Sequence, residues 1–246
     1  MTQSIETVRV HRQAHAFAEL AMQLHDSTTT TETADAVVRF AIPAVACDHA
    51  GIALQDADGV ITIGTVSSDV ARELYALQIG HGDGPMIAAM QHGVVLHIPN
   101  SAAETRWPAW SRAAVAAGVG SVVHLALQAG NSTLGALSLS KQAYDGFSAD
   151  DLAIAHVLAR HAAIAVATAQ RREVMTTKVD ARKLVGQAMG ILMERHDLDA
   201  DRAFAVLRRY AEEYDLKLQQ VAEQVVAGRR FTRPKPSAPT DLHAAG

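Results

Sequence analysis

The sequence predicts an α+β fold in two parts, an N-terminal antiparallel sheet flanked by helices and a C-terminal bundle of three short helices. Residues 49–66 and 121–140 each pair two β-like runs around a turn-forming segment, which is typical of a hairpin. Residues 179–228 instead carry apolar side chains at helical spacing. Residues 1–170 hold 8 Lys and Arg against 15 Asp and Glu, whereas residues 171–233 hold 13 against 10. A surface for a polyanion is therefore expected only as a patch on the C-terminal part.

Length and composition are those of a globular protein. The 246 residues suit one large or two small domains. No apolar run approaches the ~20 residues that span a bilayer, and the start of the chain lacks the apolar stretch of a secretory signal. We therefore expect a cytoplasmic protein without a membrane segment. The one cysteine, Cys47, excludes an internal disulfide and a cysteine-based zinc site, and we expect it to be buried and not a nucleophile.

Two helices are predicted before the first hairpin, over residues 5–25 and 33–45. Three side chains of metal-binding type share one face of the first helix at spacings of four: His11, His15 and Glu19. We favour a solvated face over a metal site, and no metal is predicted.

The middle of the chain alternates between strand-like and helix-like segments. The predicted elements are strands at 49–55 and 60–66, a helix at 70–77, a glycine-rich loop at 80–85, a helix at 86–92, a strand at 94–98, a helix at 108–117, and strands at 121–128 and 133–140. A sheet of five or six strands follows.

A long helix is predicted over residues 149–175, with Ser148 as its N-cap and Asp151 three positions later. One apolar face is expected to pack on the sheet: Ile154, Val157, Leu158, Ile164 and Ala165. A second stripe has near-heptad spacing: Leu152, Ala155, Ala159, Ala162, Val166 and Ala169. We favour a homodimer seam over burial within one protomer for this stripe, because small residues let helices approach closely.

The C-terminal bundle follows from three apolar stripes. They are Leu184, Ala188, Ile191 and Leu192; then Ala203, Phe204, Leu207 and Ala211; then Leu218, Val221, Ala222 and Val225. Asp199 is expected to cap the second helix and Gly228 to end the third.

Two features exceed what a small bundle needs. Gly186 and Gly190 should each cost about 1 kcal/mol inside a helix, and both face away from Leu184 and Ile191, so another molecule could approach the backbone there. Cations lie outside the apolar stripes: Arg182, Lys183, Arg195, Arg208, Arg209 and Lys217. Such side chains either hold phosphates or form a solvated helix face.

This segment resembles an ANTAR domain, the RNA-binding output module of bacterial antiterminators. The matching pieces are Gln187 to Met193, Ala203-Phe204, Leu207 to Arg209, Ala211, Leu218, Val221-Ala222 and Val225-Val226. The resemblance implies binding of short RNA stem-loops beside a transcription terminator, usually by a dimer.

Given the resemblance, we expect an RNA-binding role for eight residues. Unpaired loop bases are read by stacking and by hydrogen bonds to their edges. Gln187 can read a base edge, Gly190 allows close approach, and Tyr210 is either a stacking surface or a core aromatic. Phosphate contacts are expected from Arg182, Lys183, Arg208, Arg209 and Lys217.

Residues 14–170 resemble a GAF domain of the actinobacterial type found in front of ANTAR modules. The motifs are Gly82 to Pro85, Arg106-Trp107-Pro108, Gly118 to Val122, Leu134 to Leu137 and Phe147-Ser148. Relatives often carry Glu and Cys where this chain has Asp83 and Met86, so thiol-based sensing is not expected. The resemblance leaves open a small-molecule ligand and identifies no cofactor.

The prediction is therefore a GAF-like sensor domain at 1–172, an ANTAR-like RNA-binding domain at 173–230, and a disordered tail at 231–246. Around the start of this tail, Arg229, Arg230 and Arg233 add nonspecific RNA attraction or only solubility. The GxxxxGK[ST], HExxH and GxSxG motifs are absent, so we expect a regulator of antitermination and not an enzyme. Two alternatives stay open: a DNA-binding transcription factor, and a ligand sensor whose bundle only dimerises.

Overall fold

The computed structural model describes residue 15 and residues 17–228. Two predictions reach beyond this range. The His11 part of the N-terminal helix and the tail with Arg229, Arg230 and Arg233 lie outside the described residues. The chain divides into two compact units after Glu173, and each is described by itself.

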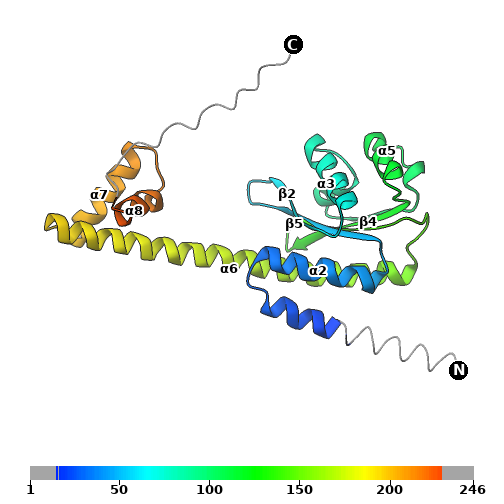
Figure 1. Ribbon diagram of the computed structural model, residues 1–246, viewed down its shortest axis with the longest axis horizontal. Helices are drawn as coiled ribbons and strands as arrows, with labels where there is room; N and C mark the ends of the chain where they lie inside the picture. Colours follow the sequence, from blue (N-terminus) through cyan, green and yellow to red (C-terminus); the bar gives the residue numbers. More distant parts are fainter. Residues whose placement is uncertain (1–14, 16, 229–246) are drawn as a thin grey trace, which may run out of the picture. The chain divides into compact units, whose positions relative to one another are not determined.

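The first unit is built on one antiparallel sheet of five strands in the order β2-β1-β5-β4-β3 (Figure 1). The strands are β1 His49–Gln55, β2 Ile61–Val66, β3 Val95–Ile98, β4 Ser121–Ala129 and β5 Ser132–Lys141. Both predicted hairpins are present, because β1 pairs with β2 and β4 pairs with β5. The predicted α+β class with an antiparallel sheet is confirmed.

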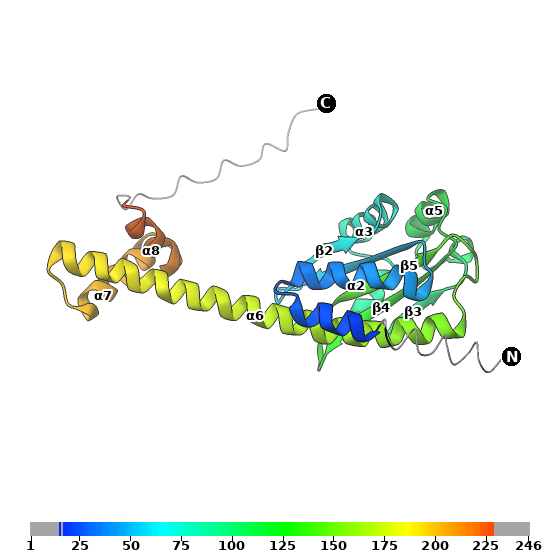
Figure 2. The same ribbon diagram turned by 60° about the horizontal axis from the view of Figure 1, so that its bottom comes forward.

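Helices cover both faces of this sheet. One face carries the helix at residues 17–26, α2 Thr30–Val45 and the first part of α6 Ala149–His196. The other face carries α3 Asp69–His81, α4 Pro85–His92 and α5 Pro108–Ala116 (Figure 2). A short 3-10 helix, η1, spans Ser101–Ala103.

Two helices extend beyond their predicted ends. α2 begins at Thr30, since Thr29 caps it in a reciprocal pair with Glu32. α3 continues through Gly80 to His81 and ends where Gly82 adopts a φ of 65°. The predicted glycine-rich loop is therefore shorter than expected.

α6 begins as predicted, because Ser148 Oγ and the Asp151 carboxylate each accept a hydrogen bond from the other residue's backbone N–H at 3.1 Å. It then runs to His196 as one helix, so the first helix of the C-terminal bundle is its last part and not a separate short helix. Thr176 and Thr177 do not end it. β-branched residues cost only about 0.5 kcal/mol each in a helix, less than a lost turn of hydrogen bonds.

The predicted roles of the two apolar faces of α6 are only partly met: Leu158 is fully buried and Ile154 packs against the sheet core, as expected. Val157 and Ile164, expected on the sheet, are 46% and 65% exposed. The stripe assigned to a dimer seam is instead buried within the protomer at five positions: Ala155, Ala159, Ala162, Val166 and Ala169. Alanines let the helix lie close to the sheet and α2, where longer side chains would hold it away. By length and composition α6 could cross a membrane, but 39% of its most apolar stretch is buried inside the protein, as in a partly buried core helix.

The second unit packs the last part of α6 against α7 Ala200–Glu213 and α8 Leu218–Val226 (Figure 1). The side chains buried in its core are Ala188, Leu192, Ala203, Leu207, Val221, Ala222 and Val225. Asp199 caps α7 by accepting the Arg202 N–H at 2.8 Å, and Gly228 follows α8 with a φ of 66°, both as predicted. Phe204, predicted to face inward, is 39% exposed, because the Ala203–Leu207 stripe already fills the core-facing side of α7.

Candidate functional site

Polar and small residues cover the surface of α6 in the second unit. Arg182, Lys183, Gln187 and Gly190 are all exposed, outside the buried stripe of Ala188 and Leu192. Lys183, Gln187 and Gly190 follow one another at spacings of four and three, so they share one helical face. Arg182 lies on a neighbouring face, about 100° around the helix from Lys183.

The two glycines of this helix leave open surface. A Cβ built on Gly186 or Gly190 would meet no atom within 4 Å. Packing among the described residues therefore does not require glycine at either position. The prediction that another molecule approaches the backbone at Gly190 keeps its physical basis.

The remaining predicted cations are on and beside α7. Arg208, Arg209 and Lys217 are exposed, and Arg208 Nε lies 3.6 Å from a Glu212 carboxylate oxygen. On α6, Lys183 Nζ lies 3.8 Å from Asp180. Exposed pairs of this kind contribute only about 0–1 kcal/mol, so either cation can exchange its partner for a phosphate at little cost.

Aromatic side chains lie on two sides of α7. Tyr210 is half-buried against the core and stacks on Tyr214 with ring centroids 5.1 Å apart, contacts that suit a core aromatic. Phe204 is exposed one turn before Arg208, on the same face. Sequence reasoning missed this pair, although the four-residue spacing from Ala200 through Phe204 to Arg208 could have indicated it.

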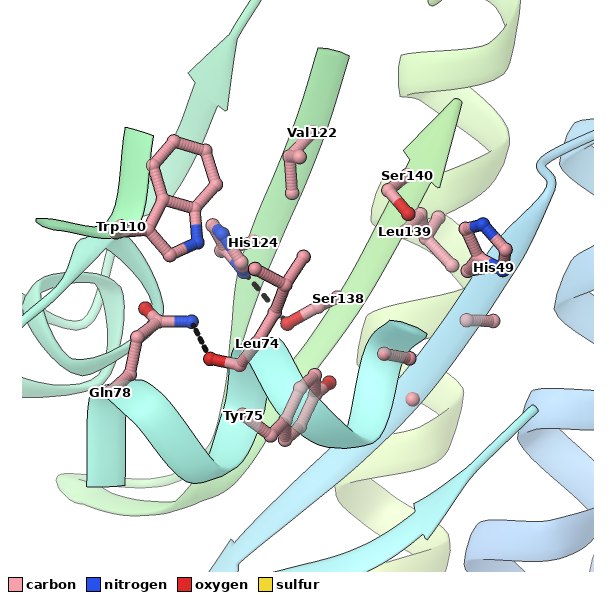
Figure 3. A pocket seen from close by; sticks show the side chains of 13 residues that line it. His49, Leu74, Tyr75, Gln78, Trp110, Val122, His124, Ser138, Leu139 and Ser140 are labelled. Atoms are coloured by element: carbon pink, nitrogen blue, oxygen red, sulfur yellow. Dashed lines mark hydrogen bonds between the residues drawn. The ribbon is translucent and has the colours of Figure 1, made fainter. Parts of the chain in front are cut away.

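A second candidate site is a small cavity in the first unit, between the sheet and helices α3 and α5 (Figure 3). Tyr75 of α3, Trp110 of α5 and His124 of β4 line it. The space open to water in it is about 20 Å³, which holds about one water molecule. Gly51 of β1 makes room for Tyr75, because a Cβ there would lie 3.0 Å from the Tyr75 hydroxyl.

Burial sets the charge state of the cavity. His124 hydrogen-bonds Ser138 through Nδ1 at 2.7 Å, and burial lowers the pKa of His124 to about 3, so its ring is neutral at physiological pH. Burial likewise raises the pKa of the Tyr75 phenol, and Ser138 lowers it in part, although no Ser138 atom meets hydrogen-bonding geometry with Tyr75 Oη. Both side chains therefore act here as neutral hydrogen-bonding groups.

Three polar atoms on this cavity have no hydrogen-bond partner within the described residues: Tyr75 Oη, Trp110 Nε1 and His124 Nε2. Gln78, by contrast, donates to the Leu74 carbonyl at 3.0 Å and accepts the Met86 N–H at 2.8 Å. Sequence reasoning did not single out Tyr75, Trp110 or His124.

Two sequence motifs meet at the surface beside this cavity. The Asp83 carboxylate accepts the Gly84 N–H at 2.8 Å and the Trp107 indole N–H at 3.1 Å. Arg106 lies over the Trp107 ring at 4.5 Å and donates to Glu104, and these hydrogen bonds lower the pKa of the Glu104 carboxyl. Asp83 thus joins the loop before α4 to the loop before α5.

The thiol of the chain and its metal-binding side chains form no further candidate site among the described residues. Cys47 is buried, and burial raises the pKa of its thiol to about 11, so it is not a thiolate at neutral pH. Within residues 15 and 17–228, no three His, Cys, Asp or Glu side chains are grouped closely enough to hold a metal ion.

Family models match both parts of the chain. A GAF domain model matches residues 27–167 and an ANTAR domain model matches residues 173–226. An ANTAR domain implies an RNA-binding regulator of antitermination, and a GAF domain implies signal sensing. Both are domains typical of regulators and not of enzymes. No curated protein matches the chain.

Solved structures share the fold at low sequence identity. The GAF domain of a phosphoenolpyruvate-protein phosphotransferase from Coxiella burnetii is 13% identical, with a TM-score of 0.52 over 66% of this chain and 96% of that chain. The corresponding Acinetobacter domain is 15% identical, with a TM-score of 0.50 over 65% and 95%. A Stigmatella aurantiaca phytochrome photosensory core module is 15% identical, with a TM-score of 0.55 over 85% and 46%. Since the GAF model matches more than half of its residues, the chain belongs to the GAF domain family, and an ANTAR domain follows its GAF domain.

Proposed function

We propose that this protein is a cytoplasmic, signal-responsive regulator of the kind found in actinobacteria, which binds stem-loops in nascent transcripts and promotes antitermination. The observation that carries the proposal is the exposed set of cations on a three-helix domain that the ANTAR model matches. The GAF domain, residues 1–172, provides the signal input, and residues 173–230 provide the output.

The RNA contacts are assigned by chemistry. Arg182, Lys183, Arg208, Arg209 and Lys217 are exposed and suit phosphate oxygens. Gln187 is exposed beside the open backbone of Gly190, so its amide can reach the edge of an unpaired base. The Tyr210 ring already stacks on Tyr214, so a base would have to stack on the end of an existing pair.

We propose a homodimer formed through the long helix, residues 149–175. The buried alanine stripe cannot form the dimer interface, so we assign the interface to the exposed apolar residues of α6. In the GAF domain these are Val157 and Ile164, seven residues apart on one face. Past Glu173, Met175 and Val179 are also exposed. Sedimentation of Ile164→Glu would test this contact, and a variant that remains a dimer would contradict it.

RNA binding is tested directly with the full chain. Paired hairpins with purine-containing loops would be titrated across a salt series, against scrambled stems and duplex DNA. We expect tight binding that depends on the loop sequence and excludes duplex DNA. Preference for duplex DNA would support a transcription factor instead, and weak binding that vanishes with salt would leave a bundle that only dimerises.

The residue roles are tested by Arg208→Ala/Arg209→Ala. Losing two phosphate contacts should weaken hairpin binding about 10- to 100-fold and lower the slope of log affinity against log salt by ~1–2. The matched control is Arg72→Ala/Arg112→Ala, which removes the same charge from exposed sites in the GAF domain. Equal binding by both double variants would refute the roles of Arg208 and Arg209.

A further inference from the structure

The polar atoms of the GAF cavity define the chemistry of what it can hold. The indole N–H of Trp110 can only donate a hydrogen bond, whereas Tyr75 Oη can donate or accept. With His124 Nε2 these atoms are buried on one cavity without partners in the described chain. A buried polar group without a partner is destabilising, so an occupant that satisfies Trp110 must offer an acceptor.

The rest of the cavity wall mixes apolar side chains with four polar ones: His49, Gln78, Ser138 and Ser140. Leu74, Val122 and Leu139 line it, and none of its described lining residues is Asp, Glu, Lys or Arg. His124 is neutral because it is buried. His49 also lines the wall, and its Nδ1 shares a hydrogen bond with Ser68 Oγ at 2.9 Å. An ion would therefore enter without a carboxylate, ammonium or guanidinium counter-charge, and burying an ion without one is unfavourable. The wall therefore favours an uncharged molecule over carboxylates, phosphates and nucleotides.

Trp110 separates this cavity from a second hollow nearer the surface. The outer hollow is about 80 Å³ and shares Gln78 and Trp110 with the inner one. Trp107, Asp83 and Gly84 form its outer wall. Figure 3 shows the Trp110 ring and Gln78 on one side of the inner cavity, facing His124. An outward shift of the Trp110 ring that keeps its indole N–H on the inner cavity would join the two hollows, and would supply both an entry route and the room that the inner cavity lacks.

We propose that the signal taken by the GAF domain is a small uncharged molecule with a carbonyl or hydroxyl oxygen on an otherwise apolar body. Its oxygen accepts the Trp110 indole N–H and is shared with Tyr75 or His124, and its body lies against Leu74, Val122 and Leu139. The inference rests on the proposed sensing function and deepens it by naming the ligand class.

The test uses indole N–H resonances of the ¹⁵N-labelled full chain, because the protein has two tryptophans and Trp107→Phe assigns the Trp110 signal. The three probes have the same five-membered carbon ring and differ in its polar group: cyclopentanone, cyclopentane and cyclopentanecarboxylate. We expect cyclopentanone to shift the Trp110 signal saturably. Cyclopentane should bind about tenfold more weakly, and the carboxylate should cause no saturable shift.

Tyr75→Phe keeps the shape of the wall and removes one hydroxyl, and it should raise the Kd for cyclopentanone about fivefold. The control, Tyr144→Phe, removes a hydroxyl from an exposed tyrosine and should leave the Kd unchanged. Equal binding of cyclopentanone and cyclopentane, preference for the carboxylate, or no saturable shift with any probe would overturn the inference. Hairpin binding by the same samples separates the two proposals, since failure of the ligand test with intact RNA binding overturns only the ligand class.

Discussion

The two domains of this chain use polar side chains in opposite ways. The GAF domain buries Tyr75, Trp110 and His124 around a small cavity. The ANTAR domain exposes Arg208, Arg209 and Lys183, and the buried side chains of its described core are all aliphatic. A sensor removes its ligand from water, so the polar side chains that recognise the ligand are themselves buried and lose their hydration. A polyanion is recognised at a surface, where cations keep their hydration until contact. The comparison predicts a large sensitivity to pH in one domain and to salt in the other.

The largest expected effect is a loss of stability confined to the ANTAR domain, which has the smaller hydrophobic core. Leu207 is fully buried among the seven buried side chains of the ANTAR core. Leu207→Ala should cost about 2–5 kcal/mol, because the lost packing cannot be recovered in so small a core. Hydrogen exchange should show lost protection in α7 and α8 with β4 and β5 unchanged. The control is Val226→Ala at an exposed position, and unchanged protection in α7 would contradict the prediction.

Buried His124 should make the stability of the GAF domain depend on pH. The pKa of His124 is about 3 in the folded protein against 6.5 for the free side chain. Below pH 6.5 the unfolded chain therefore binds a proton that the folded chain does not, and stability falls as pH falls toward 3. The loss is about 1.4 kcal/mol per pH unit, or roughly 2 kcal/mol between pH 6.5 and pH 5.

Urea unfolding followed by tryptophan fluorescence at pH 7, 6 and 5 measures this loss. His124→Gln, which cannot titrate, should flatten the dependence whatever its effect on stability at pH 7. The matched control, His92→Gln, changes an exposed histidine at the end of α4 and should keep the wild-type slope. If His124→Gln also keeps that slope, His124 is not its source.

At the end of the GAF unit, Glu173 joins α6 to α2. Its carboxylate accepts the Thr30 backbone N–H and the Thr30 hydroxyl, both at 2.7 Å, at the N-terminus of α2. Glu173→Gln keeps an acceptor but removes the negative charge that the helix dipole favours, and should lower GAF stability by about 1 kcal/mol. Urea unfolding checks this against Glu73→Gln on the exposed face of α3. Equal urea midpoints for the two variants would show that the charge at Glu173 contributes nothing to the stability of the GAF domain.

The sequence predicted the hairpins and several individual cap residues best, because turn and cap residues act locally. Asp199, Ser148 and Gly228 all serve as expected. It failed on the faces of α6, since Ala159 and Ile164 are both apolar and only the close approach of the sheet selects the smaller one. The cavity was not foreseen, because its polar lining comes from three separate segments in which each aromatic residue looks like ordinary core.

The smallest expected change in stability comes from Gly190→Ala, and this substitution distinguishes an effect on domain stability from an effect on RNA binding. Gly190 is exposed within α6, and a Cβ there would meet nothing within 4 Å. Gly190→Ala should therefore stabilise the ANTAR domain by about 0.5–1 kcal/mol through helix propensity alone. If an RNA loop lies on that backbone, the same methyl group should weaken hairpin binding.

Gly186→Ala is the control, because it offers the same gain in propensity at a position to which no RNA contact is assigned. Both variants should show more protected amides in the last turns of α6, and only Gly190→Ala should lose affinity. Since a stabilised domain that binds less well cannot be explained by damage to the fold, this pair isolates the contact itself. Equal affinities would remove Gly190 from the RNA surface and leave recognition to the side chains of Gln187 and the cations.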